Sequence, residues 1–121
     1  MDYEISLSED NSIVVVRIKK SLSTQIALIF TKEAIELGDK HNTDKHLIDL
    51  RGIRNTWSVF ETYQFAQDIK KSGRQRLDKV TLVIDPEDET HSFLETTLLN
   101  QNYNNRLFRD HGKAIAWLKE K

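Results

Sequence analysis

Short apolar runs alternate with longer segments of helical periodicity along this chain, and that alternation limits the folds it can adopt. Five runs are predicted to be strands, over residues 3–7, 13–18, 46–50, 79–84 and 105–109. Four segments show the three- and four-residue apolar spacing of a helix, beginning near Ser23, Thr56, Asp88 or Thr90, and Asp110. The order β-β-α-β-α-β-α-β-α predicts a single α/β domain over residues 1–121. Its sheet is mixed but mostly parallel and flanked by helices, and the opening hairpin adds the antiparallel strand.

The composition narrows the chemistry that the chain can carry. It has no cysteine, which excludes disulfides, thiolate nucleophiles and zinc–thiolate sites. Its formal net charge is -1, so no overall attraction to nucleic acid or to an acidic membrane is expected. No apolar run approaches the roughly 20 residues of a membrane span, and the acidic start differs from a signal peptide. We therefore expect a cytoplasmic protein with no membrane insertion, no nucleic-acid partner and no cofactor.

A strand, a turn and a helix over residues 46–71 carry the candidate site. The apolar strand Leu47-Ile48-Asp49-Leu50 leads into a polar turn over residues 51–55, and a helical pattern follows over residues 56–71. Gly52 permits backbone angles in this turn that a side chain would resist. In an open α/β sheet, ligands and partners bind at the loops that follow the strands. The turn and the start of the next helix are therefore the predicted binding region.

Two arginines and two aromatic residues in this region form the predicted partner surface: Arg51, Arg54, Trp57 and Phe60. The apolar stripe of the helix is drawn through Val59, Thr62, Tyr63, Ala66 and Ile69, which leaves both aromatics on its flank. Exposed Trp and Arg side chains are typical of protein interfaces. The alternative is ordinary packing of the aromatics beneath the turn.

Several segments resemble a known family. Residues 47–53, Leu-Ile-Asp-Leu-Arg-Gly-Ile, resemble the central strand and turn of the STAS (SpoIIAA-like) domain, the fold of bacterial anti-sigma-factor antagonists. Segments 90–95, 104–109 and 114–118 are similar to a bacterial branch of STAS-like proteins. The resemblance implies a regulatory, protein-binding role. In the antagonists a hydroxyl at the start of the helix after the central strand is phosphorylated, which releases the partner. Ser58 occupies that position, although Trp57 and Val59 replace the family's Asp and Gly.

Ser58 also suits a structural role. Ser58-Val59-Phe60-Glu61 matches the capping-box pattern, in which a hydroxyl and a carboxylate satisfy the first amides of a helix. Thr56 is a second hydroxyl that could cap the same helix. The residues leave both interpretations of Ser58 open, as phosphoacceptor and as helix cap.

Two further functions rest on weaker patterns. His91 and Glu95 are four residues apart and share a helix face, with Asp85 nearby, so an acid–base or metal-assisted enzyme is one alternative. Against it, no second histidine stands at ligand spacing. A small-ligand or lipid carrier is the other alternative, although a chain of this length leaves little room for a lipid-sized cavity. The basic run over residues 70–79 contains no aromatic residue and is interpreted as a solvated loop.

These observations favour a non-enzymatic regulatory or protein-interaction module. Its partner is expected to be a protein of unknown identity, and a homodimer is compatible with the sequence. Neither a catalytic residue nor a metal ligand is assigned.

Overall fold

The computed structural model describes residues 2–120. Within that range one sheet has five strands, in the spatial order β1-β2-β3-β4-β5. They are β1 (Tyr3–Leu7), β2 (Val14–Ile18), β3 (Lys45–Asp49), β4 (Lys79–Val83) and β5 (Asn105–Phe108). β1 runs antiparallel to β2, and the other neighbouring pairs are parallel. The predicted mixed sheet with an opening hairpin is confirmed, and β5 lies at an edge as its short, charged sequence predicted.

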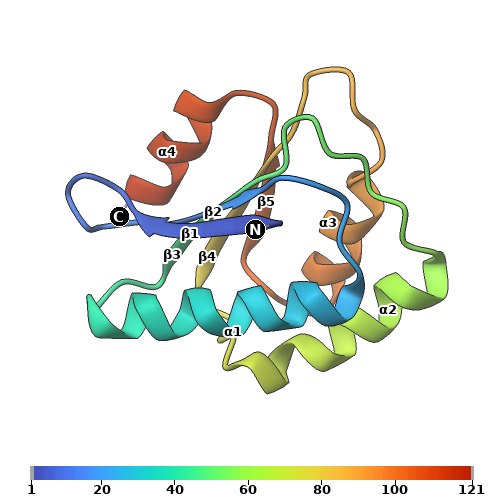
Figure 1. Cartoon of the computed structure of the whole chain (residues 1–121), viewed down its shortest axis with the longest axis horizontal. Coiled ribbons are helices and arrows are strands. Elements are labelled where there is room, and N and C mark those ends of the chain that lie inside the picture. Colours follow the sequence, from blue (N-terminus) through green and yellow to red (C-terminus); the bar gives the residue numbers. More distant parts are fainter. Residues whose placement is uncertain (1, 121) are drawn as a thin grey trace.

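Helices cover both faces of this sheet. Those within residues 2–120 are α1 (Thr24–Lys40), α2 (Val59–Asp68), the short 3-10 helix η1 (Ile69–Ser72), α3 (Ser92–Asn100) and α4 (His111–Lys119). Figure 1 shows α1, α2 and α3 on one side of the strands and α4 on the other. The chain is therefore a three-layer α/β fold, as the alternation of its segments predicts.

Each face of the sheet has its own apolar core, because successive side chains of a strand point to opposite faces. The larger core joins the sheet to α1, α2 and α3. Its members include Val14, Val16, Phe30, Phe65, Leu82 and Leu94. The smaller core lies under α4 and contains Ile13, Leu47, Val83, Ala114 and Leu118. Burial on both faces explains why the central strands read as continuous apolar runs.

Side-chain caps mark where three of the helices begin. Ser23 Oγ accepts from the amide of Ile26 at 3.2 Å, and Asp110 Oδ1 accepts from that of Lys113 at 2.9 Å. Ser58 caps α2 in the capping box that the sequence predicted. The predicted start of the third helix near Asp88 or Thr90 is wrong, because Asp88 Oδ1 accepts from the amide and hydroxyl of Thr90 within the preceding loop. This turn holds the loop, and α3 begins later, at Ser92.

The predicted stripe of α2 is confirmed at Thr62, Ala66 and Ile69, which are buried, and is wrong at Val59 and Tyr63. Thr62, Phe65 and Ala66 are buried, whereas Val59 and Tyr63 are 60% and 51% exposed. The helix is turned so that the large ring of Phe65 enters the core, where it removes more apolar surface from water than the predicted face would. No helix within residues 2–120 has both the length and the apolar character needed to cross a membrane.

Candidate functional site

A buried carboxylate ends β3 and anchors the turn that follows. Asp49 is 5% exposed, and its oxygens accept hydrogen bonds from Arg17 Nη1 at 2.9 Å and from Arg51 Nε and Nη2 at 2.9 and 2.8 Å. Burial by itself raises the pKa of Asp49, but the Arg51 hydrogen bonds and both arginine charges outweigh it and lower the net pKa. Arg51 is thus held against the end of its own strand while part of its side chain remains exposed.

The turn is tied to the loop that follows β4. The amide of Gly52, which has a positive φ of 83°, donates to Asp85 Oδ2 at 2.7 Å. The amide of Asn55 donates to Thr90 Oγ1 at 2.9 Å, and His91 Nε2 lies 2.7 Å from the carbonyl oxygen of Ile53. The loops after two neighbouring parallel strands therefore form one connected wall, as expected at this edge of a parallel sheet.

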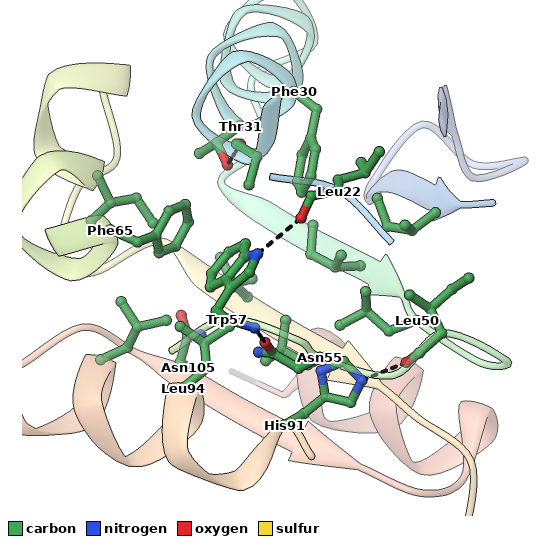
Figure 2. A pocket seen from close by; sticks show the side chains of 18 of the residues that line it. Leu22, Phe30, Thr31, Leu50, Asn55, Trp57, Phe65, His91, Leu94 and Asn105 are labelled. Atoms are coloured by element: carbon green, nitrogen blue, oxygen red, sulfur yellow. Dashed lines mark hydrogen bonds between the residues drawn. The ribbon is translucent and has the colours of Figure 1, made fainter. Parts of the chain in front are cut away.

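Trp57 points from this wall towards the protein interior. Its backbone amide donates to Asn55 Oδ1 at 2.7 Å, and its indole Nε1 donates to the carbonyl oxygen of Leu22 at 2.9 Å. The ring lies 4.9 Å from that of Phe65, centroid to centroid, and packs against the larger core. Figure 2 shows Trp57 between the wall that carries His91 and the start of α1.

Trp57 lines a cavity of about 110 Å³ between the sheet and the helices α1, α2 and α3. Most of its lining is apolar and includes Leu22, Phe30, Ile48, Phe65, Leu82 and Leu94. Three exposed residues also line it and mark its outer side: Ser21, Arg54 and Thr56. Ser21 Oγ donates to the carbonyl oxygen of Arg54 at 3.3 Å, so the segments before α1 and α2 meet there.

The inner side of the cavity is polar, with His46, Arg74 and Asn105 in its lining. The strand register places His46, Val80 and Asn105 side by side on β3, β4 and β5. All three polar residues are at most 5% exposed. Arg74 follows Gly73, whose φ of 96° ends η1 and turns the chain back towards the sheet. The prediction that the basic run over residues 70–79 is a solvated loop is wrong at Arg74, which is buried.

Burial perturbs both basic groups at this end. It lowers the pKa of Arg74 to about 10, which leaves the guanidinium charged at neutral pH, with Asp78 acting in the opposite direction. It also lowers the pKa of His46 to about 4, and the charge of Arg74 adds to that shift. His46 is therefore a neutral imidazole near pH 7 and Arg74 is a buried cation.

The structure does not bring His91, Glu95 and Asp85 together. His91 Nε2 faces the carbonyl oxygen of Ile53 and is 3.4 Å from Asp88 Oδ2. Glu95 instead accepts from the amide of Leu107 on β5 at 2.5 Å, and Asp85 accepts from Gly52. In the part of the chain that the structure describes, no three His, Asp or Glu side chains are arranged to hold a metal ion.

An exposed group of large apolar side chains lies on the outer surface of α2 and α3. We call it the aromatic patch, and it consists of Val59, Phe60, Tyr63 and Phe93. Phe60 is 75% exposed, and the rings of Tyr63 and Phe93 meet edge to face at 5.6 Å. The four residues of the predicted partner surface therefore do not lie together. Phe60 belongs to this patch, and Arg51 is bound to Asp49. Arg54 and Trp57 both line the cavity, with Arg54 exposed on its outer side.

Ser58 lies exposed at the start of the patch-bearing helix. Its Oγ accepts from the amide of Glu61 at 3.1 Å, while its own amide donates to Glu61 Oε1 at 2.9 Å. The hydroxyl therefore has the structural role that the capping-box pattern predicted, and its role as a phosphoacceptor stays a prediction.

Sequence reasoning missed most of both sites. His46 and Arg74 carry no signal in a single sequence, because their burial depends on strands and loops that meet only in the folded chain. Val59 and Tyr63 had one usable signal in the sequence. An apolar stripe of α2 drawn through Phe65 would have left both of them on the exposed side of the helix.

Comparison of the chain with protein-family models, with curated proteins and with solved structures finds no match.

Proposed function

We propose that this chain is a non-enzymatic protein-interaction module of regulatory type, STAS-like, that binds a protein partner through the aromatic patch. The observation that carries the proposal is the exposure of Phe60, a large apolar ring directed to solvent on a capped helix. Contiguous exposed apolar side chains mark interaction surfaces, and aromatic residues dominate the energetics of interfaces. The cytoplasm is the compartment we propose for this role.

Neighbouring polar groups support the same surface. Arg54 lies exposed in the turn between β3 and α2, and it forms no ion pair within residues 2–120. An exposed arginine a few residues before the helix that carries the patch would favour the approach of an acidic partner. Phosphorylation of Ser58 would place about two negative charges next to Phe60 and so would weaken binding of such a partner.

Substitution of Phe60 tests this proposal, with Leu77→Ser as the matched control. Leu77 is 84% exposed and lies outside the patch, in the loop before β4. Cross-linking and pull-down from the native host should lose a specific partner with Phe60→Ser and retain it with Leu77→Ser. Both variants should unfold at the same temperature as the original protein, because neither side chain is buried. Equal capture by the two variants would refute the proposal.

The cavity favours a second candidate function, that of a small-ligand carrier. A largely apolar pocket with a few converging polar groups is the usual form of a ligand site. Its volume of about 110 Å³ suits a small molecule and not a whole lipid. Native mass spectrometry of freshly purified protein tests this candidate, since a carrier would retain an added mass that disappears on denaturation.

A further inference from the structure

We propose that the cavity binds a small monocarboxylate with a compact apolar body, whose carboxylate contacts Arg74 and His46. This inference rests on the ligand-carrier candidate and is independent of the aromatic patch. It names the chemical class of ligand, which the shape of the cavity alone leaves open.

The first observation is that Arg74 is a buried cation without an anionic partner in contact. Its Nη2 donates to Asn105 Oδ1 at 2.8 Å and to the carbonyl oxygen of Asp78 at 3.2 Å, and its Nε donates to that of Gln75 at 3.2 Å. Within residues 2–120 its Nη1 donates to no protein atom, and no carboxylate forms an ion pair with it. The carboxylate of Asp78 instead accepts from the amide of Gln75. The charge of Asp78 acts on Arg74 without contacting it, and the guanidinium also lies over the ring of Tyr103. The compensation by a carboxylate is therefore indirect, and an anion in the cavity would give Arg74 a partner in contact.

The second observation is a histidine that lines the same cavity without a protein partner. His46 is 4% exposed, and neither of its ring nitrogens forms a hydrogen bond within the described part of the chain. Within residues 2–120 the fully buried side-chain atoms without a partner are Thr81 Oγ1 and His91 Nδ1, so the ring nitrogens of His46 are not sealed off. A neutral imidazole has one N–H to donate, which can bind one oxygen of an anion.

The donors at this end match a carboxylate better than a phosphate. Arg74 Nη1 carries two N–H groups and the neutral imidazole carries one, and the two oxygens of a carboxylate have enough lone pairs to accept from all three. A phosphate carries more negative charge, which the single cation Arg74 would leave partly uncompensated in a buried site. Burying it here would therefore cost more free energy than the site returns.

The rest of the cavity defines the apolar body of the ligand. Beyond the polar end, the walls are side chains such as Phe30, Phe65 and Leu82, with Trp57 among them. A dry apolar cavity of about 150 Å³ holds one benzene molecule. The present volume of about 110 Å³ is smaller than that, so the apolar body is at most one ring or a short branched chain, and it would extend towards the outer side at Ser21 and Thr56.

Benzoate and benzyl alcohol are the matched probes, because they share the ring and differ in charge. Binding is measured by calorimetry and by Trp57 fluorescence in a Trp117→Phe background, since Trp117 packs on the opposite face of the sheet. We expect benzoate to bind at least about tenfold more tightly than benzyl alcohol, as a charge-assisted hydrogen bond would give. Equal binding of the two probes, or no saturable benzoate binding at about 10 mM, overturns the proposal.

Arg74→Met should remove the preference for benzoate, and Arg76→Met is the matched control. Both arginines lie over the ring of Tyr103, at 5.1 Å from its centroid, but Arg76 is exposed and does not line the cavity. Retention of the preference in Arg74→Met would overturn the assignment of the anion site.

A measurement on the unaltered side chains covers the case in which Arg74→Met fails to fold. The ¹⁵N resonances of His46 should shift when benzoate is added and should remain unchanged with benzyl alcohol. The opposite pattern refutes the proposed carboxylate position. Phe60→Ser should bind benzoate normally, so failure of the ligand proposal and failure of the protein-interaction proposal give different results.

Discussion

Trp57 Nε1 donates a hydrogen bond to the carbonyl oxygen of Leu22, 2.9 Å away and 35 positions earlier in the chain. This bond joins the segment before α1 to the segment before α2 on one side of the cavity. The same ring packs on Phe65, so a single side chain links two loops and the face of a helix. Trp57 is therefore a structural part of the cavity wall, and Phe60 alone represents the two predicted aromatics on the outer surface.

Substitutions of Trp57 should separate the contribution of its hydrogen bond to Leu22 from that of its packing on Phe65. Trp57→Phe keeps an aromatic ring but loses the donor to Leu22, and we expect the free energy of unfolding to fall by about 1 kcal/mol. Trp57→Ala also loses the packing on Phe65 and leaves a larger cavity, so we expect a fall of about 3 kcal/mol. Urea denaturation monitored by circular dichroism measures both values.

Trp117→Phe provides the comparison for Trp57→Phe. The indole nitrogen of Trp117 donates no hydrogen bond within residues 2–120, and its ring packs against Phe108 at 6.0 Å. We expect this change to cost less than the loss of the Trp57 donor. Equal costs for the two Trp→Phe variants would show that the bond to Leu22 contributes nothing to stability.

The buried imidazole of His46 should make folding sensitive to acid. Its pKa is about 4 in the folded chain and 6.5 as an ordinary histidine, because burial and the charge of Arg74 oppose protonation. Below pH 6.5 the unfolded chain takes up a proton that the folded chain does not bind until about pH 4. Stability is therefore lost as pH falls through this window, and the loss amounts to roughly 3 kcal/mol.

Urea denaturation at several values between pH 7 and pH 4 measures this effect against His46→Leu. The difference in unfolding free energy between the original protein and the variant should shift by roughly 3 kcal/mol, while other titrating groups cancel. His41→Gln, at an exposed position five residues earlier, should leave the pH dependence unchanged. Parallel curves for the original protein and His46→Leu would show that His46 takes up its proton over the same pH range in the folded and unfolded chains.

The capping box at α2 should contribute measurable stability. Ser58→Ala removes the acceptor for the amide of Glu61, and we expect the free energy of unfolding to fall by about 1 kcal/mol. Ser58→Gly should lower the free energy of unfolding by only roughly 0.3 kcal/mol, because water reaches the freed amides. Thermal and urea unfolding provide both values.

Thr56→Ala is the matched control for the cap. Thr56 is exposed two residues earlier, and its hydroxyl forms no hydrogen bond within the described residues. Its substitution should change stability by less than about 0.5 kcal/mol. If Thr56→Ala costs as much as Ser58→Ala, the hydroxyl of Ser58 is not what stabilises the start of the helix.

The sequence by itself determined the class of fold, the order of the strands and helices and two details at their ends. Alternating or continuous apolar runs depend on neighbouring residues, and so do the Ser58–Glu61 box and the turn at Gly52. These are local properties, because an amide at a helix start or a positive φ is satisfied by residues a few positions away.

The tertiary structure alone decided which of these residues form a site. Arg74 became a buried cation because the side-chain oxygen of Asn105 on β5 joins the nearby carbonyl oxygens of Gln75 and Asp78 only after η1, β4 and β5 have packed. The face of α2 that enters the core is likewise the one that carries Phe65, whose ring packs beside Trp57. Burial is a property of neighbours from distant parts of the chain, and a local pattern contains no measure of it.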